Sequence, residues 1–209
     1  MSVEGAGGHT AHEAEGSPPL DAWLAQLGVE VVGASGRAGD AALSRDVVLD
    51  GERRFDLRVT VAWVADVGWS LWGYYGHEAM EIPRRVYLRM LRANFDYPFV
   101  KFAMTEDDRP MLITELPAQG VDRDELGRAL TRLVIVADRL LDETAPAVAD
   151  RGALPDWGGR AGRNPQLLEA HRAEVEAIMP PWAAPTPRRR RRGVFTRLFG
   201  FLRPRELRE

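Results

Sequence analysis

The stretch from residue 84 to residue 141 constrains the fold more than any other part of the chain. Its first part, residues 84–95, carries apolar side chains at the i, i+3/4, i+7 spacing of one buried helix face. We expect that face to consist of Tyr87, Leu88, Leu91 and Phe95. Two β-rich runs follow at residues 99–104 and 111–116, on either side of a charged turn. This part of the sequence therefore predicts a helix and a two-stranded hairpin.

A second helix completes the stretch. Asp122 followed by Glu125 is an acidic variant of the capping box that marks a helix start. The apolar residues that recur on one face of this helix are Leu126, Leu130, Leu133, Ala137 and Leu140. These are patterns of packing and of turns, so they predict a fold and not a reaction.

The clearest single strand lies upstream, at residues 55–63. Apolar residues alternate there with polar or small ones, so one face is expected to be buried and the other wet. Residues 69–75 are the simplest hairpin partner for this strand. On that second strand, Trp72 and Tyr74 fall on the side opposite to the one expected to face the core.

Trp72 and Tyr74 are the candidate partner-binding residues of the globular part. Exposed aromatic side chains concentrate contact energy at protein interfaces. If both face outward, they favour the binding of a protein partner. The alternative is that the amino-terminal segment or residues 146–164 cover them.

The predicted fold is α+β, an antiparallel sheet with helices packed on one face, in the order α-β-β-β-α-β-β-α. A short helix at residues 20–27 and a brief strand at residues 29–32 begin this order, and residues 47–49 are a weak strand candidate. The predicted organisation has four parts: a disordered tail (1–17), the α+β domain (18–145), an irregular segment with one helix (146–179), and a proline-rich linker with an arginine-rich amphipathic tail (180–209).

Several classes of chemistry find no support in the residues. The chain has no cysteine, which excludes disulfides, thiol catalysis and cysteine-ligated metals and suits a cytoplasmic protein. His77-Glu78 resembles the start of a zinc-protease helix, but Glu81 stands where the second histidine is needed. No phosphate-binding loop or dinucleotide fingerprint occurs. We therefore expect a protein that is not an enzyme, with no catalytic residue, cofactor, metal or small-molecule substrate.

The carboxyl-terminal tail carries the second functional signal. Residues 188–209 hold nine arginines and two glutamates, a net charge of +7, so the total of −3 leaves −10 for residues 1–187. Arg188, Arg189, Arg190, Arg191 and Arg192 precede an apolar arc that contains Phe195 and Phe199. This combination is typical of attachment to an anionic membrane surface. Docking in a partner's groove, contact with RNA or DNA, and an inert or self-docked tail are the alternatives.

The element order, together with residues 97–140, resembles the YbjN-like family, described as bacterial sensory transduction regulators, whose fold is shared with type III secretion chaperones. The points of contact are Phe99–Phe102, Glu106–Arg109, Glu115–Pro117 and Asp122–Leu126. The resemblance implies a small domain that often forms a homodimer and holds another polypeptide, its client. The hairpin turn without glycine and the arginine-rich tail depart from the family pattern. The overall expectation is a cytoplasmic binding protein, peripheral at the inner face of the membrane if the tail attaches there.

Overall fold

Six strands form one antiparallel sheet in the computed structural model of the chain, which describes residues 17–76, 82–149, 154, 156 and 159–180. The first five elements are α1 (Leu20–Gln26), β1 (Val31–Ser35), β2 (Ala42–Leu49), β3 (Leu57–Val64) and β4 (Gly68–Tyr74). The remaining elements are α2 (Arg84–Asp96), β5 (Lys101–Met104), β6 (Pro110–Leu116), α3 (Arg123–Val148) and α4 (Pro165–Ala177). The predicted α+β class with an antiparallel sheet is confirmed.

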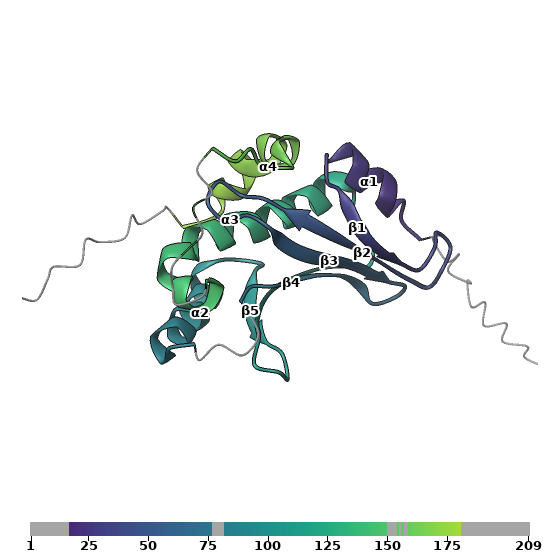
Figure 1. Cartoon of the computed structure of the whole chain (residues 1–209). Coiled ribbons are helices and arrows are strands. Elements are labelled where there is room, and N and C mark those ends of the chain that lie inside the picture. The colour runs from purple at the N-terminus through teal and green to yellow at the C-terminus, as the bar shows by residue number, and fades with distance from the viewer. Residues whose placement is uncertain (1–16, 77–81, 150–153, 155, 157–158, 181–209) are drawn as a thin grey trace, which may run out of the picture.

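The strands lie in the order β1-β2-β3-β4-β6-β5, and each pairs antiparallel with its neighbours. The long helix α3 runs along one face of this sheet, and α4 packs on α3 (Figure 1). The helix α1 packs on the same face of the sheet, because its Trp23 ring stacks on Trp69 at 5.9 Å. In the described part of the chain, the helices therefore leave the second face of the sheet uncovered.

The alternation predicted for the central hairpin is present in the structure. Leu57, Val59, Val61 and Trp63 of β3 are buried, whereas the residues between them are exposed or half-buried. The start of α3 is also as predicted, because the Asp122 carboxylate accepts a hydrogen bond from the Glu125 backbone N–H at 2.7 Å. Both features are local, and a side chain or a strand period determines each of them.

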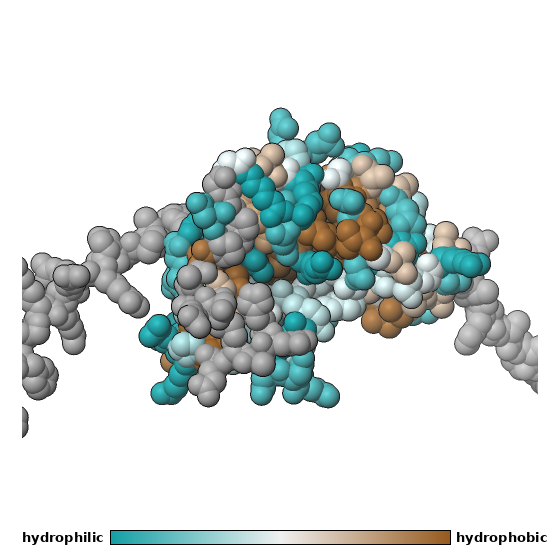
Figure 2. Space-filling model, viewed as in Figure 1, coloured by the Kyte–Doolittle hydropathy of each residue, from teal (hydrophilic) through white to brown (hydrophobic). Residues whose placement is uncertain are grey.

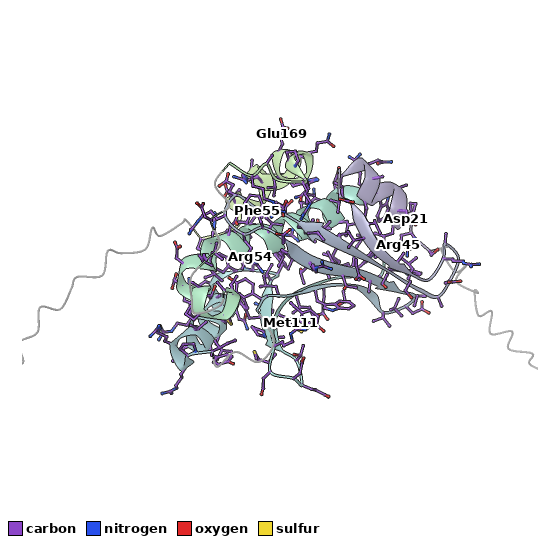
Figure 3. All side chains as sticks on the ribbon, viewed as in Figure 1. Asp21, Arg45, Arg54, Phe55, Met111 and Glu169 are labelled. Carbon is purple, nitrogen blue, oxygen red and sulfur yellow. The ribbon has the colours of Figure 1, made fainter. Side chains whose placement is uncertain are left out.

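Strand β2 is longer than the sequence indicated, so four strands and not three precede α2. The weak candidate at residues 47–49 is the end of an eight-residue strand, Ala42–Leu49. Arg45 interrupts the apolar pattern, yet it is buried because its guanidinium donates to both carboxylate oxygens of Asp21 on α1, at 2.6 and 2.8 Å (Figure 3). A long-range ion pair thus lets a charged residue occupy a position on the core face.

The buried face of α2 was predicted wrongly. The residues that α2 buries are Val86, Met90 and Ala93. Leu88, Leu91 and Phe95 lie on the opposite side and are exposed, while Tyr87 is half-buried. The helix carries two apolar faces, and periodicity does not indicate which of them meets α3 and β5.

The helix α3 continues past the predicted boundary at residue 145, through Pro146 to Val148. It is buried on nearly every side between the sheet and α4. The residues that α4 buries are Leu167, His171 and Val175. The predicted tails at residues 1–17 and 180–209 lie outside the described residues, apart from Ser17 and Pro180.

A group of polar side chains ties the segment before α4 to the sheet, and we call it the Asp50 latch (Asp50, Asp56, Arg160, Arg163 and Asn164). The fully buried Asp50 carboxylate accepts from the backbone N–H of Asp56 at 2.8 Å and from that of Arg163 at 3.1 Å. The Asn164 side chain accepts from the Asp50 N–H at 2.9 Å. Arg160 binds both carboxylate oxygens of Asp56, at 2.7 and 2.8 Å. The latch therefore joins residues more than a hundred positions apart.

The latch makes stability depend on pH in the acid range. The guanidinium groups of Arg160 and Arg163 hold the pKa of Asp56 well below its ordinary value of 3.8. A carboxyl group with a lowered folded-state pKa stabilises the fold above its unfolded pKa, and this contribution is lost as the pH falls. We expect Asp56→Asn to lower the free energy of unfolding at pH 6, and to lower it by less at about pH 3, because the contribution of the carboxylate declines once the pH falls below its unfolded pKa. Urea unfolding followed by circular dichroism measures both, and an equal effect at the two pH values would contradict the assignment.

Candidate protein-binding surface

The uncovered face of the sheet carries a continuous apolar strip across β4, β6 and β5. Trp72 lies opposite Ile113 in the strand register, and Tyr74 lies opposite Met111. Ala103 of β5 lies on the other side of Met111. Side chains opposite each other in an antiparallel pair share a face of the sheet, so these five residues form one surface, which we call the aromatic strip. In Figure 3, Met111 lies on the side of the sheet away from α4.

Trp72 and Tyr74 point away from the core, as the alternation indicated. Trp69, Leu71 and Tyr75 of the same segment are buried, whereas Trp72 is half-buried and Tyr74 is 45% exposed. The Arg109 guanidinium lies 4.3 Å from the centre of the Tyr74 ring. The role of these two aromatics in binding a partner stays a prediction.

Residues 146–164, one of the two segments that could cover the strip, are partly described. Residues 160–164 bind Asp50 and Asp56 through the latch, and these hydrogen bonds lie away from the aromatic strip. Of the amino-terminal segment, only Ser17 and the residues after it are described, and the Ser17 hydroxyl contacts the Gly39 N–H. No helix of the described residues packs on the strip.

Charged side chains surround the strip. The carboxylates on the open face or in the turn between β5 and β6 are Asp46, Glu106, Asp107, Asp108 and Glu115. The cations are Arg58, Lys101 and Arg109. Carboxylates thus outnumber cations around an apolar centre, which suits a partner that is apolar and basic.

A second apolar surface lies on α2, and sequence reasoning missed it. Leu88, Leu91 and Phe95, which we call the α2 stripe, are 40%, 63% and 93% exposed. They lie within about two turns of each other on the same side of the helix. Arg84, Arg85 and Arg92 are exposed on that side as well. The apolar pattern itself was visible in the sequence, but it was assigned to the core.

A third apolar region appears in Figure 2 as the brown surface over β1, between α1 and α4. Val31 and Val32 of β1 are exposed there. The pairing of β1 with β2 is irregular between Val31 and Gly33, and β1 is only five residues long. Short, bulged edge strands resist pairing with another chain, so this edge is a poor docking site for a strand.

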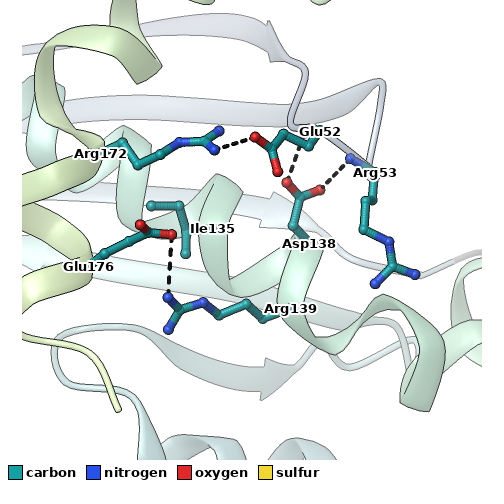
Figure 4. A pocket seen from close by; sticks show the side chains of 7 residues that line it. All are labelled: Glu52, Arg53, Ile135, Asp138, Arg139, Arg172 and Glu176. Atoms are coloured by element: carbon teal, nitrogen blue, oxygen red, sulfur yellow. Dashed lines mark hydrogen bonds and ion pairs between the residues drawn. The ribbon is translucent and has the colours of Figure 1, made fainter. Parts of the chain in front are cut away.

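A cavity of about 410 Å³ lies between α3, α4 and the loop before β3 (Figure 4). The charged side chains that line it form contacts within the protein, so they do not favour a ligand. Arg172 binds Glu52, and Arg139 binds Glu176 at 3.4 Å, so these two cations are already paired. Asp138 accepts backbone hydrogen bonds from Glu52 at 2.8 Å and from Arg53 at 3.1 Å, and burial raises the pKa of its carboxyl. The paired charges attach α4 and this loop to α3.

Histidine, aspartate and glutamate are the metal ligands that this cysteine-free chain offers. Among the described residues, no group of His, Asp and Glu has the arrangement to hold a metal ion. His171 is buried against Gly127, and burial lowers the pKa of its imidazole. His9, His12 and His77 lie outside the described residues, as do Arg188–Arg192, Phe195 and Phe199 of the tail.

The described helices lack the properties of membrane-spanning segments. None of them combines the length and the apolar character needed to cross a membrane.

A known protein family matches the part of the chain that contains the sheet. A family model with the description "Putative bacterial sensory transduction regulator" matches residues 20–145, more than half of the chain. No curated protein sequence matches. Among solved structures, the chain is similar to one chain of the heterodimeric complex ExoU-SpcU from the type III secretion system of Pseudomonas aeruginosa. The identity is 26% and the TM-score 0.40, over 58% of this chain and 94% of that chain.

Proposed function

Because the chain belongs to the YbjN family, we propose that it is a non-enzymatic, chaperone-like protein that binds another polypeptide on the open face of its sheet. The observation that carries this proposal is the aromatic strip, in which Trp72 and Tyr74 lie on the face opposite to α3. Aromatic side chains on a surface that no described helix covers supply the apolar area that binding a polypeptide requires.

The shape of the strip favours a polypeptide over a small molecule. Adjacent strands lie about 4.8 Å apart, so β4, β6 and β5 present a surface roughly 10 Å across. An α-helix with its side chains has a diameter of about 10–12 Å and matches that width. Small-molecule sites are concave and enclose most of the ligand, which a sheet face does not.

Site-specific photo-crosslinking in the native host tests this proposal. A photoreactive phenylalanine analogue at position 74 is expected to crosslink a discrete protein. The same analogue at Val67, which is 79% exposed in the turn between β3 and β4, serves as the control. The crosslinked protein, once purified, must also bind the unmodified chain in calorimetry. Crosslinking of equal yield at both positions, or no binding by the purified protein, would refute the proposal.

We further propose that the protein is a homodimer and that the α2 stripe is its self-association surface. Phe95 at 93% exposure and Leu91 at 63% are costly to leave in water. Two α2 helices that cross antiparallel near Leu91 would bury both phenylalanines. The same crossing would bring Arg85 of one copy near Asp96 of the other, so that the charges at the helix ends attract.

The dimer proposal predicts the effect of one substitution. Phe95→Glu places a carboxylate in the contact and is expected to raise the dimer dissociation constant by about 30-fold or more. Val67→Glu is the matched control, because Val67 is an isolated exposed residue in the turn between β3 and β4. Light scattering measures the mass against the 23.3 kDa of one chain. A wild-type protein that is monomeric at 100 µM (roughly a hundredfold above a micromolar dissociation constant) would exclude the dimer.

The tail supports a different class of function, in which the globular part is a scaffold. Its net charge of +7 and its phenylalanines favour reversible attachment to an anionic membrane, which would make the cytoplasmic protein peripheral at the inner face. Nucleic acid binding through the arginines is the other candidate. Liposome flotation and RNA gel shift distinguish these functions when the full chain is compared with a shortened chain that ends at Pro187. If the shortened chain retains all binding, the tail is not the attachment site.

A further inference from the structure

We propose that residues 188–202 of this chain occupy the open sheet face when no partner is bound, and that the face therefore selects arginine-rich amphipathic segments. This inference rests on the proposed function and specifies its partner class. A partner with the same chemistry would bind by displacing the tail segment. Charge, apolar matching and the position at which the described chain ends support this docking.

Charge favours the open face as the docking site of the tail. Residues 188–202 contain six arginines and no acidic residue. Around the aromatic strip, five carboxylates stand against three cations, and Glu106, Asp107 and Asp108 are exposed together in one turn. This turn lies directly before β6, where Met111 pairs with Tyr74. Arginines of the segment can pair with the turn while its phenylalanines cover the strip.

The same criterion excludes the α2 stripe as the docking site. Arg84, Arg85 and Arg92 are exposed beside Leu88, Leu91 and Phe95. An arginine-rich segment would meet like charges there, which cost free energy at an interface. Of the aromatic strip and the α2 stripe, only the aromatic strip thus offers the tail both apolar area and opposite charge.

The aromatic strip also matches the chemistry of the segment. Phe195 and Phe199 are spaced by four residues, so one face of a helix presents both. Arg109 already stacks on Tyr74, which shows that a guanidinium can lie on this face against an aromatic ring. Additional arginines from the tail can bind Trp72 in the same way.

The described chain ends where the segment can reach this face. The Pro180 carbonyl accepts a hydrogen bond from the Arg139 guanidinium at 3.0 Å, on the second half of α3. In Figure 1 the described chain ends, in yellow, at the same end of the molecule as α2. The seven residues from 181 to 187, which precede the segment, span about 22 Å when extended at 3.1 Å per residue. That length exceeds the two layers of about 10 Å each that separate the two sides.

Disulfide trapping in the full chain tests the inference, because the natural sequence has no cysteine. Tyr74→Cys with Phe199→Cys is the test pair, and Phe95→Cys with Phe199→Cys is the matched control on the α2 stripe. Under mild oxidation the test pair is expected to form its disulfide at least about tenfold faster than the control, within one chain or between two copies. Salt near 1 M, where the screening length is about 3 Å, is expected to slow the test pair selectively.

Equal rates for the two pairs, or a faster control pair, would overturn the inference. The proposed function has its own readout, the photo-crosslink from position 74 to another protein. If that crosslink forms while the disulfide does not, the face binds a partner and the tail is not its occupant. If the test pair reacts rapidly and no partner is ever captured, the tail docks and the chaperone-like function fails. Loss of both signals refutes both proposals.

Discussion

Replacement of Trp72 and Tyr74 together by alanine is expected to weaken partner binding by at least about 100-fold. Central aromatic anchors commonly contribute about 2 kcal/mol or more each, and their effects are not strictly additive. Both side chains lie on the aromatic strip, opposite Ile113 and Met111. Calorimetry or surface plasmon resonance with the partner captured from position 74 measures the loss.

The control for this double variant is Lys101→Ala. Lys101 is exposed on the same face, opposite Ile113, and donates to the Asn94 carbonyl. A charge at the rim of an interface contributes little, so we expect a change below about threefold. Thermal unfolding must show that both variants are folded. Equal losses for the control and the double variant would argue against an aromatic hot spot.

Asp50→Ala is expected to lower the free energy of unfolding by about 3 kcal/mol, the largest stability effect of any single change considered. Asp50 is fully buried, and its carboxylate accepts from Asp56 N–H and Arg163 N–H. Removing a buried carboxylate leaves these two backbone N–H groups without their acceptor, whereas the Arg163 guanidinium keeps its bond to Asp56 at 2.7 Å, and unpaired buried donors typically cost about 1–3 kcal/mol each. Urea unfolding at pH 7 measures the loss.

Asp56→Asn is the matched control for this prediction. It removes the charge that faces Arg160, but Asp56 is exposed, and exposed ion pairs contribute about 1 kcal/mol or less. Asparagine also tolerates the positive φ of 58° at this position. If Asp50→Ala lowers the free energy of unfolding by no more than Asp56→Asn does, the buried Asp50 carboxylate does not hold the segment before α4.

Local patterns in the sequence predicted the parts of the fold that depend on neighbours in the chain. The alternation of residues 55–63 and 69–75 gave β3 and β4 and the outward direction of Trp72 and Tyr74. Asp122 and Glu125 marked the start of α3. A period of two residues or a capping side chain leaves few alternatives.

Features that depend on distant residues could not be predicted in this way. Arg45 is buried on the core face of β2 because its guanidinium pairs with Asp21, 24 positions away. The Asp50 latch joins residues 114 positions apart and has no local pattern. For α2, both apolar faces satisfied the helical period, and only the packing against α3 and β5 selected Val86, Met90 and Ala93.

The position of α4 has a practical consequence for work on the isolated domain. The family pattern ends at residue 145, inside α3, yet α4 covers the outer side of α3 and the latch fixes it there. A fragment that ends at residue 145 would lose the end of α3 and all of α4. It would expose the apolar side of α3 that Leu167 and Val175 of α4 cover. Recombinant versions intended for crystallisation or spectroscopy should therefore extend to Pro180, where the hydrogen bond to Arg139 closes the globular unit.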